Sequence, residues 1–178
     1  MSDRRKKTVL RTIRITQEVD DVLRESAQDK NLSVNALIAA IMTKYVEWDR
    51  YVEKLNFISI ASETFKTVLA EIDGEKLEKI AKEYGSKMAK TASMFFFKKA
   101  DSETFLEVIS LFSKYSRLRT NEIETSGRNY TITLHHNLGE KWSTFVRHFM
   151  AQAFNNVLGF LPQTDVSENV IIISFSVP

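Results

Sequence analysis

A cluster of basic side chains at the start of the chain points most clearly to chemistry. Residues 1–16 contain six basic residues and one acidic residue, a net charge of +5, whereas the whole chain carries only +2. Lysine and arginine displace counterions condensed on nucleic-acid phosphates, so a local basic segment favours a nucleic-acid partner. The alternative is a tail that only keeps the protein in solution. We expect five of these residues to contact DNA phosphates: Arg4, Arg5, Lys6, Lys7 and Arg11.

The segment that follows alternates in a way that predicts a β-strand. In TVLRTIRIT, residues 8–16, successive side chains of a strand would point to opposite sides. One side ends in the apolar residues Ile13 and Ile15, which must lie on other apolar groups. The other side presents a row that we expect to be exposed, consisting of Leu10, Thr12 and Arg14.

Two helices are predicted directly after this strand. Thr16 is placed to cap a helix that starts near Gln17, and Asn31 suits a left-handed position at its end. Ser33 is placed to cap a second helix, whose apolar residues recur at three-to-four spacing to about Leu55. No cluster of proline, glycine or serine follows, so a helix is expected to join this module to the rest of the chain.

A single strand is unstable in water, so residues 8–16 need a partner strand. A second copy of the chain can supply it, and the two antiparallel strands would form a ribbon whose width suits the DNA major groove. The alternative is an ordinary α+β fold in which residues 56–60 or 170–177 pair with the segment. In that case Arg14 is only a surface charge.

Taken in this order and spacing, these features resemble the ribbon-helix-helix (Arc/MetJ/CopG-like) DNA-binding family. The resemblance covers residues 11–48 and is carried by the strand, by EVDDVLR at residues 18–24, by the turn with Asn31, and by SVN at residues 33–35. It implies a homodimer on double-stranded DNA, with a tetramer or higher oligomer as a further option. We expect the dimer core to contain Ile13, Ile15, Leu23, Leu37, Ile38 and Ile41.

The resemblance also implies roles for the exposed row and for the start of the second helix. Leu10, Thr12 and Arg14 match the positions that read base edges in the family. Arg14 can contact guanine through two hydrogen bonds, and Thr12 can exchange a hydrogen bond or touch a thymine methyl group. Leu10 departs from the polar residue that relatives often carry. The backbone amides at the start of the second helix would clamp a phosphate, a role that the helix dipole also favours, at Ser33, Val34 and Asn35.

Residues 49–178 predict a second, α+β domain after the module of residues 1–48. Helical patterns occupy residues 62–72, 74–97 and 102–115, and a hairpin is expected over residues 121–136 with Tyr130, Ile132 and Leu134 on one face. A helix over residues 139–157 and a strand at residues 170–177, buried on both faces, complete it, with NFISI at 56–60 as a short strand. We expect helices packed on a small, mostly antiparallel sheet, and three consecutive phenylalanines at 95–97 that serve packing or oligomerisation.

No catalytic or metal-binding pattern is found in the sequence. The chain has no cysteine, and it lacks the glycine-rich, HExxH and GxSxG motifs of common enzymes. His135, His136 and His148 are the only candidates for soft-metal ligation. Adjacent strand residues face opposite sides, so His135 and His136 are not expected to hold one ion together. We therefore expect no enzyme activity, no metal and no cofactor.

These observations predict a DNA-binding transcriptional regulator of the repressor type, with a C-terminal domain for oligomerisation or for an effector. No apolar leader or membrane span is recognisable, so a cytoplasmic protein without membrane contact is expected. The alternative function is an antitoxin-like DNA-binding protein whose C-terminal domain binds a partner protein. A third option is a nucleoid protein that binds phosphates with little base preference.

Overall fold

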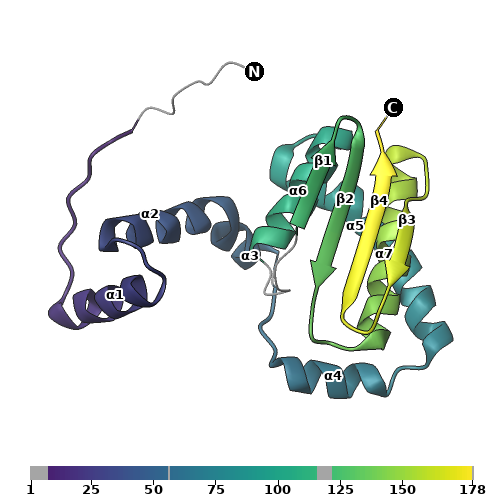
Figure 1. The fold of residues 1–178 in the computed structure, drawn as a ribbon, viewed down its shortest axis with the longest axis horizontal. Helices are drawn as coiled ribbons and strands as arrows, with labels where there is room; N and C mark the ends of the chain where they lie inside the picture. The colour runs from purple at the N-terminus through teal and green to yellow at the C-terminus, as the bar shows by residue number, and fades with distance from the viewer. Residues whose placement is uncertain (1–7, 56, 116–121, 178) are drawn as a thin grey trace. The chain divides into compact units, whose positions relative to one another are not determined.

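We analysed a computed structural model of the chain, which describes residues 8–55, 57–115 and 122–177 (Figure 1). The chain divides into two compact units, Met1–Val46 and Glu47–Pro178, which are called unit 1 and unit 2 below. The predicted phosphate contacts Arg4, Arg5, Lys6 and Lys7 lie outside the described residues. In the described parts of the chain, no helix is long and apolar enough to cross a membrane.

Unit 1 contains the two predicted helices, α1 (Gln17–Asp29) and α2 (Val34–Lys44). The Thr16 side chain accepts a hydrogen bond from the amide of Val19 at 3.4 Å, so the predicted cap of α1 is confirmed. Asn31 has a φ of 53°, which confirms the predicted left-handed residue in the turn. The Ser33 side chain accepts from the amide of Ala36 at 3.1 Å, which confirms the cap of α2.

The predicted strand at residues 8–16 takes no regular secondary structure in the single chain. The ribbon of a ribbon-helix-helix module is therefore not confirmed. The physical reason is that a strand needs a ladder partner, and neither of the alternatives within the chain supplies one. Residues 57–60 form no strand, and both edges of the strand at Val170–Ser176 are already occupied by neighbouring strands.

The helix that begins with α2 continues further, as predicted, but with an irregular turn. A π-helical segment, η1 (Tyr45–Asp49), follows α2, and α3 (Arg50–Lys54) follows η1. The boundary between the two units falls within η1, between Val46 and Glu47. Single π-turns inside helices are uncommon and are often found at functional positions.

Unit 2 is an α+β fold with helices α4 (Ser62–Ala70), α5 (Gly74–Phe97), α6 (Ser102–Tyr115) and α7 (Glu140–Leu158). These helices confirm the predicted helical patterns. The Asp73 side chain caps α5 by accepting from the amides of Glu75 and Lys76. Gly159, with a φ of 79°, ends α7 in the left-handed conformation that glycine favours.

A four-stranded antiparallel sheet completes unit 2, in the order β1-β2-β4-β3. The predicted hairpin is confirmed as β1 (Glu122–Ser126) and β2 (Asn129–His135), and β4 (Val170–Ser176) pairs with β2. Tyr130, Ile132 and Leu134 share a face, as predicted, and lie opposite Phe175, Ile173 and Ile171 of β4. Figure 1 shows α5, α6 and α7 on one side of this sheet.

Three predictions about strands need correction. NFISI is wrong as a strand, because Phe57–Ile60 has no strand structure and Phe57 instead packs its ring near Trp48, at a centroid distance of 6.2 Å. The strand β3 (Gln163–Val166) was not predicted, because its polar sequence QTDV was assigned to a loop. β4 is fully buried on one face only, since Ile172 and Ser174 on its other face are half-buried.

The core of unit 2 lies between the sheet and the helices. Its fully buried side chains include Ile132, Phe154, Ile171 and Ile173. α5 and α7 approach so closely that a Cβ added to Gly85 would lie 2.3 Å from the carbonyl oxygen of Phe149. Glycine at this position therefore allows the close crossing of the two helices.

Candidate nucleic-acid interface

The row predicted to read base edges is exposed. Leu10, Thr12 and Arg14 all lie on the surface of the extended segment at residues 8–16, and Leu10 is 91% exposed. Arg11 is also exposed and donates only a long hydrogen bond of 3.5 Å to the carbonyl of Leu10. These side chains are available to a partner, while the single chain does not order them into a ribbon.

The start of α2 has the features of an anion site. Ser33 and Asn35 are exposed and Val34 is half-buried. The Ser33 side chain satisfies the amide of Ala36, and the carbonyl of Ser33 accepts from the amide of Leu37 at 3.0 Å. Within the described residues, the amides of Val34 and Asn35 have no hydrogen-bond partner, as is usual for the first turn of a helix.

The two helices of unit 1 differ in charge at their starts. The first turn of α1 contains Glu18 and Asp20, whereas the first turn of α2 contains no acidic residue. Acidic side chains at a helix start neutralise the positive end of the helix dipole and repel phosphate. Of the two helix starts, only that of α2 is therefore suited to bind a phosphate.

Unit 1 has almost no core of its own. Among its described residues only Ala27 and Leu37 are buried. Of the residues predicted for a dimer core, Leu37 is 5% exposed, Leu23 and Ile38 are half-buried, and Ile13, Ile15 and Ile41 are exposed by 50%, 43% and 50%. Apolar side chains that gather on an exposed surface are typical of sites that bind another surface.

Several apolar residues of unit 1 belong to the same exposed set but were not predicted for the dimer core. Their signal in the sequence was the helical spacing: Val22 follows Val19 by three positions, and Tyr45 and Val46 follow Met42 by three and four positions. They are Val19, Val22, Met42, Tyr45 and Val46, each exposed by 46% or more.

In unit 2, His136 and Ser143 form a pair that resembles part of a catalytic triad. His136 Nε2 lies 2.8 Å from Ser143 Oγ. However, the amide of Leu138 donates to His136 Nδ1 at 3.2 Å, so the proton of a neutral ring is on Nε2. Nε2 therefore donates to Ser143, whose hydroxyl donates to the carbonyl of Glu168 at 3.1 Å. In this arrangement Nε2 donates to the serine hydroxyl and does not accept its proton.

The environment of His136 keeps its ring neutral. The side chain is 8% exposed, and burial lowers the pKa of His136 from its ordinary value, with a smaller contribution from the nearby charge of His135. A neutral ring is what the hydrogen bonds to Leu138 and Ser143 require. The ring links the end of β2 to the start of α7.

The remaining metal candidates do not come together. His148 Nε2 lies 3.7 Å from a carboxylate oxygen of Glu78 and 3.2 Å from the guanidinium of Arg147. A neighbouring guanidinium disfavours a cation at this nitrogen. In the part of the chain that the structure describes, no group of three or more potential ligand residues could hold a metal ion.

The three consecutive phenylalanines pack inside unit 2. Phe96 is 9% exposed and stacks on Trp48 of η1 with ring centroids 6.1 Å apart. Phe95 and Phe97 pack against the same cluster. Lys114 of α6 donates to Glu47 at 2.8 Å, which adds a polar contact at the edge of this cluster. The packing role predicted for these phenylalanines is confirmed.

Comparisons of the chain with protein-family models, curated proteins and solved structures found no match. The resemblance to ribbon-helix-helix proteins therefore rests on the residues of unit 1 alone.

Proposed function

We propose that the protein is a sequence-specific DNA-binding transcriptional regulator, acting as a repressor through a homodimer formed by unit 1. The observation that carries the proposal is the exposed alternating segment at residues 8–16, joined to two capped helices whose apolar side chains are also exposed. A second copy would supply both the missing strand and the missing core.

The size of unit 1 supports a dimer. A unit of fewer than about 50 residues buries too little apolar surface to be stable without additional contacts. Pairing two copies through residues 8–16 places Ile13 and Ile15 on the helices and satisfies the backbone groups of the segment. The chain then folds and dimerises in one step, as obligate homodimers do.

In this dimer, the side chains on the opposite face of the ribbon would read DNA. Arg14 would contact guanine through two hydrogen bonds, and Thr12 would read a neighbouring base edge or a thymine methyl group. Leu10 offers only apolar contact, so it would favour a thymine methyl group. Each bidentate contact contributes about 1–3 kcal/mol of discrimination against the wrong base.

Phosphate contacts would set the position of the ribbon on the duplex. The amides of Val34 and Asn35 would bind one phosphate on each side of the dimer, supported by the helix dipole of α2. Arg11 and the basic residues before it would add contacts that depend on salt. The antitoxin alternative fits less well, because unit 2 has a buried core rather than a short polar tail.

Selection of DNA from a random duplex library tests the proposal. A two-fold symmetric dimer should enrich an inverted repeat, because the symmetry of the site mirrors that of the protein. Enrichment of sequences without two-fold symmetry would contradict the dimer, and no enrichment at all would contradict base reading.

A further inference from the structure

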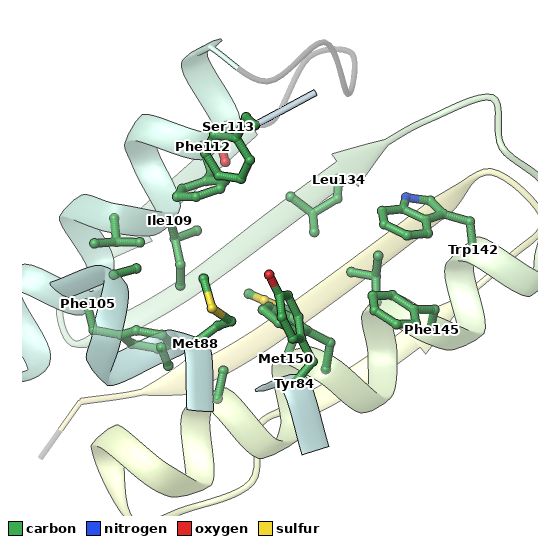
Figure 2. Close-up of a pocket in the computed structure, with 17 residues that line it drawn as sticks. Tyr84, Met88, Phe105, Ile109, Phe112, Ser113, Leu134, Trp142, Phe145 and Met150 are labelled. Carbon is green, nitrogen blue, oxygen red and sulfur yellow. The ribbon is translucent and has the colours of Figure 1, made fainter. Parts of the chain in front are cut away.

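Unit 2 contains a cavity that the proposed DNA-binding function does not use. It lies between α5, α6 and α7, with Leu134 of β2 and Phe57 completing its wall, and its volume is about 260 Å³. Figure 2 shows Met88 and Met150 near its middle, with Ile109 and Phe112 on one side and Trp142 and Phe145 on the other.

The lining of the cavity is almost wholly apolar. None of the lining residues carries a charge, and only Tyr84, Ser113 and Trp142 carry a side-chain oxygen or nitrogen. Tyr84 is 48% exposed, so one part of the lining reaches the surface. A charged ligand would lose its hydration here without gaining a partner, which excludes phosphates, carboxylates and metal ions.

Aromatic rings form one wall. Trp142 and Phe145 of α7 stack with centroids 5.0 Å apart, and Phe149 follows at 6.1 Å from Phe145. Rings arranged in this way offer faces and edges to a flat ligand. The sulfur atoms of Met88 and Met150 would add favourable contacts with an aromatic ring of that ligand.

One residue of the lining, Trp142, carries an unsatisfied polar atom. Trp142 Nε1 is buried and has no acceptor among the residues that the structure describes. Buried donors of this kind almost always have a partner in a folded protein. Because this nitrogen has almost no accessible surface, it offers no hydrogen bond to a molecule in the cavity.

The cavity is larger than a packing defect. Protein interiors have few voids larger than a water molecule, and an apolar cavity of about 150 Å³ is large enough to bind benzene. The cavity in unit 2 therefore has room for a bicyclic aromatic molecule. The small side chains of Ala89 and Ala92 on α5 leave this space open.

We propose that this cavity binds a small, uncharged, mainly aromatic molecule of about the size of naphthalene or indole. The site lies entirely within unit 2 and does not depend on the proposed DNA binding.

Methionine-methyl NMR of the full chain, titrated with naphthalene, tests the proposal directly. Met88 and Met150 line the cavity, whereas Met42 and Met94 do not, so the chain contains its own control signals. We expect saturable shifts of the Met88 and Met150 signals, and unchanged Met42 and Met94 signals. The absence of saturable shifts, or equal shifts of all four signals, would overturn the proposal.

A matched pair of variants on α6 sharpens the test. Ser113→Leu adds bulk to the cavity wall, and Ser110→Leu makes the same change at an exposed residue outside it. We expect Ser113→Leu to weaken naphthalene binding by at least about tenfold and Ser110→Leu to leave it unchanged. Equal affinities in the two folded variants would place the ligand elsewhere. If Ser113→Leu does not fold, the methionine-methyl shifts of the unmodified chain show whether naphthalene binds in the cavity.

Discussion

At the scale of single residues, Arg14 and Arg11 carry like charges, and the proposed ribbon would place them on opposite faces and give them different roles. Arg14→Ala should lower affinity for the selected site by about 1–3 kcal/mol and relax preference at one base pair. Arg11→Ala should weaken binding to selected and scrambled duplexes alike, because a phosphate contact does not depend on sequence. Fluorescence anisotropy with both duplexes measures the two effects. Equal losses of specificity in the two variants would remove Arg14 from the base-reading residues.

His136 should make the stability of unit 2 depend on pH. Its pKa in the folded chain is lowered by burial, so the unfolded chain binds the proton more readily. The free energy of unfolding should therefore fall as pH drops through the ordinary histidine range near about 6.5, and level off below the folded pKa. Urea unfolding at a series of pH values measures this slope.

His136→Gln should reduce the slope, whatever it does to stability at neutral pH. His148→Gln serves as the comparison, because burial also lowers the pKa of His148 while the charge of Glu78 opposes the effect. An unchanged slope in His136→Gln would show that the pKa of His136 does not differ between the folded and the unfolded chain.

Local features of single residues were well predicted from the sequence. The caps at Thr16 and Ser33 and the left-handed Asn31 follow from side-chain chemistry within a few residues. The hydrogen bonds of His136 were not predictable in the same way. They join the residue after β2 to Ser143 of α7 and to Asn169 in the β3-β4 turn, which only the tertiary fold brings together.

At the scale of elements, the central expectation is that residues 8–16 pair with the same segment of a second copy. The chain has no cysteine, so single cysteines can be introduced without background reactions. In an antiparallel ribbon, the residue at the two-fold axis lies opposite its own copy, with Cα atoms about 4.5–5.5 Å apart. This distance permits a disulfide.

A cysteine scan from residue 9 to residue 16 should therefore give one position with efficient crosslinking between two chains and a decline on either side. Non-reducing electrophoresis after mild oxidation measures the yield. Ile58→Cys is the control, because Ile58 is 85% exposed in a segment without strand structure. Uniformly low yields, or yields no higher than that of the control, would mean that the ribbon does not form.

The crossing of α5 and α7 gives a second prediction at this scale. Gly85→Ala would place a methyl group 2.3 Å from the Phe149 carbonyl oxygen, and the backbone must move to accept it. We expect a loss of about 1–3 kcal/mol in the free energy of unfolding, measured by urea denaturation. Gly74→Ala is the matched control at the start of the same helix, where the added Cβ meets no atom within 4 Å apart from its own stretch of chain, and it should not destabilise the protein.

The elements of unit 2 were predictable where hydrophobic periodicity is strong. All of its long helices and the hairpin were anticipated, because their apolar residues recur at regular spacing. β3 was missed because QTDV has no apolar alternation, and its strand structure depends on pairing with β4. NFISI was assigned wrongly because a short apolar run does not distinguish a strand from a packed loop.

At the scale of the whole molecule, the two units differ in how complete they are. Unit 2 has a buried core and a four-stranded sheet in which every strand has a partner, whereas unit 1 leaves most of its apolar residues exposed. The sequence indicated this division through the basic N-terminus and the unpaired strand. It did not indicate the cavity, because a cavity depends on how side-chain volumes from three helices fit together.

The most direct test of the account is fluorescence anisotropy of the full chain on a selected duplex and on a scrambled duplex, from about 50 to about 200 mM salt. Affinity for both duplexes should fall as salt rises, because phosphate contacts release counterions. The account predicts a large preference for the selected duplex that persists across the series, since base contacts are less sensitive to salt than phosphate contacts. Equal affinities for the two duplexes, with the same steep dependence on salt, would contradict base reading by Arg14 and Thr12 and leave unit 1 as a phosphate-binding module.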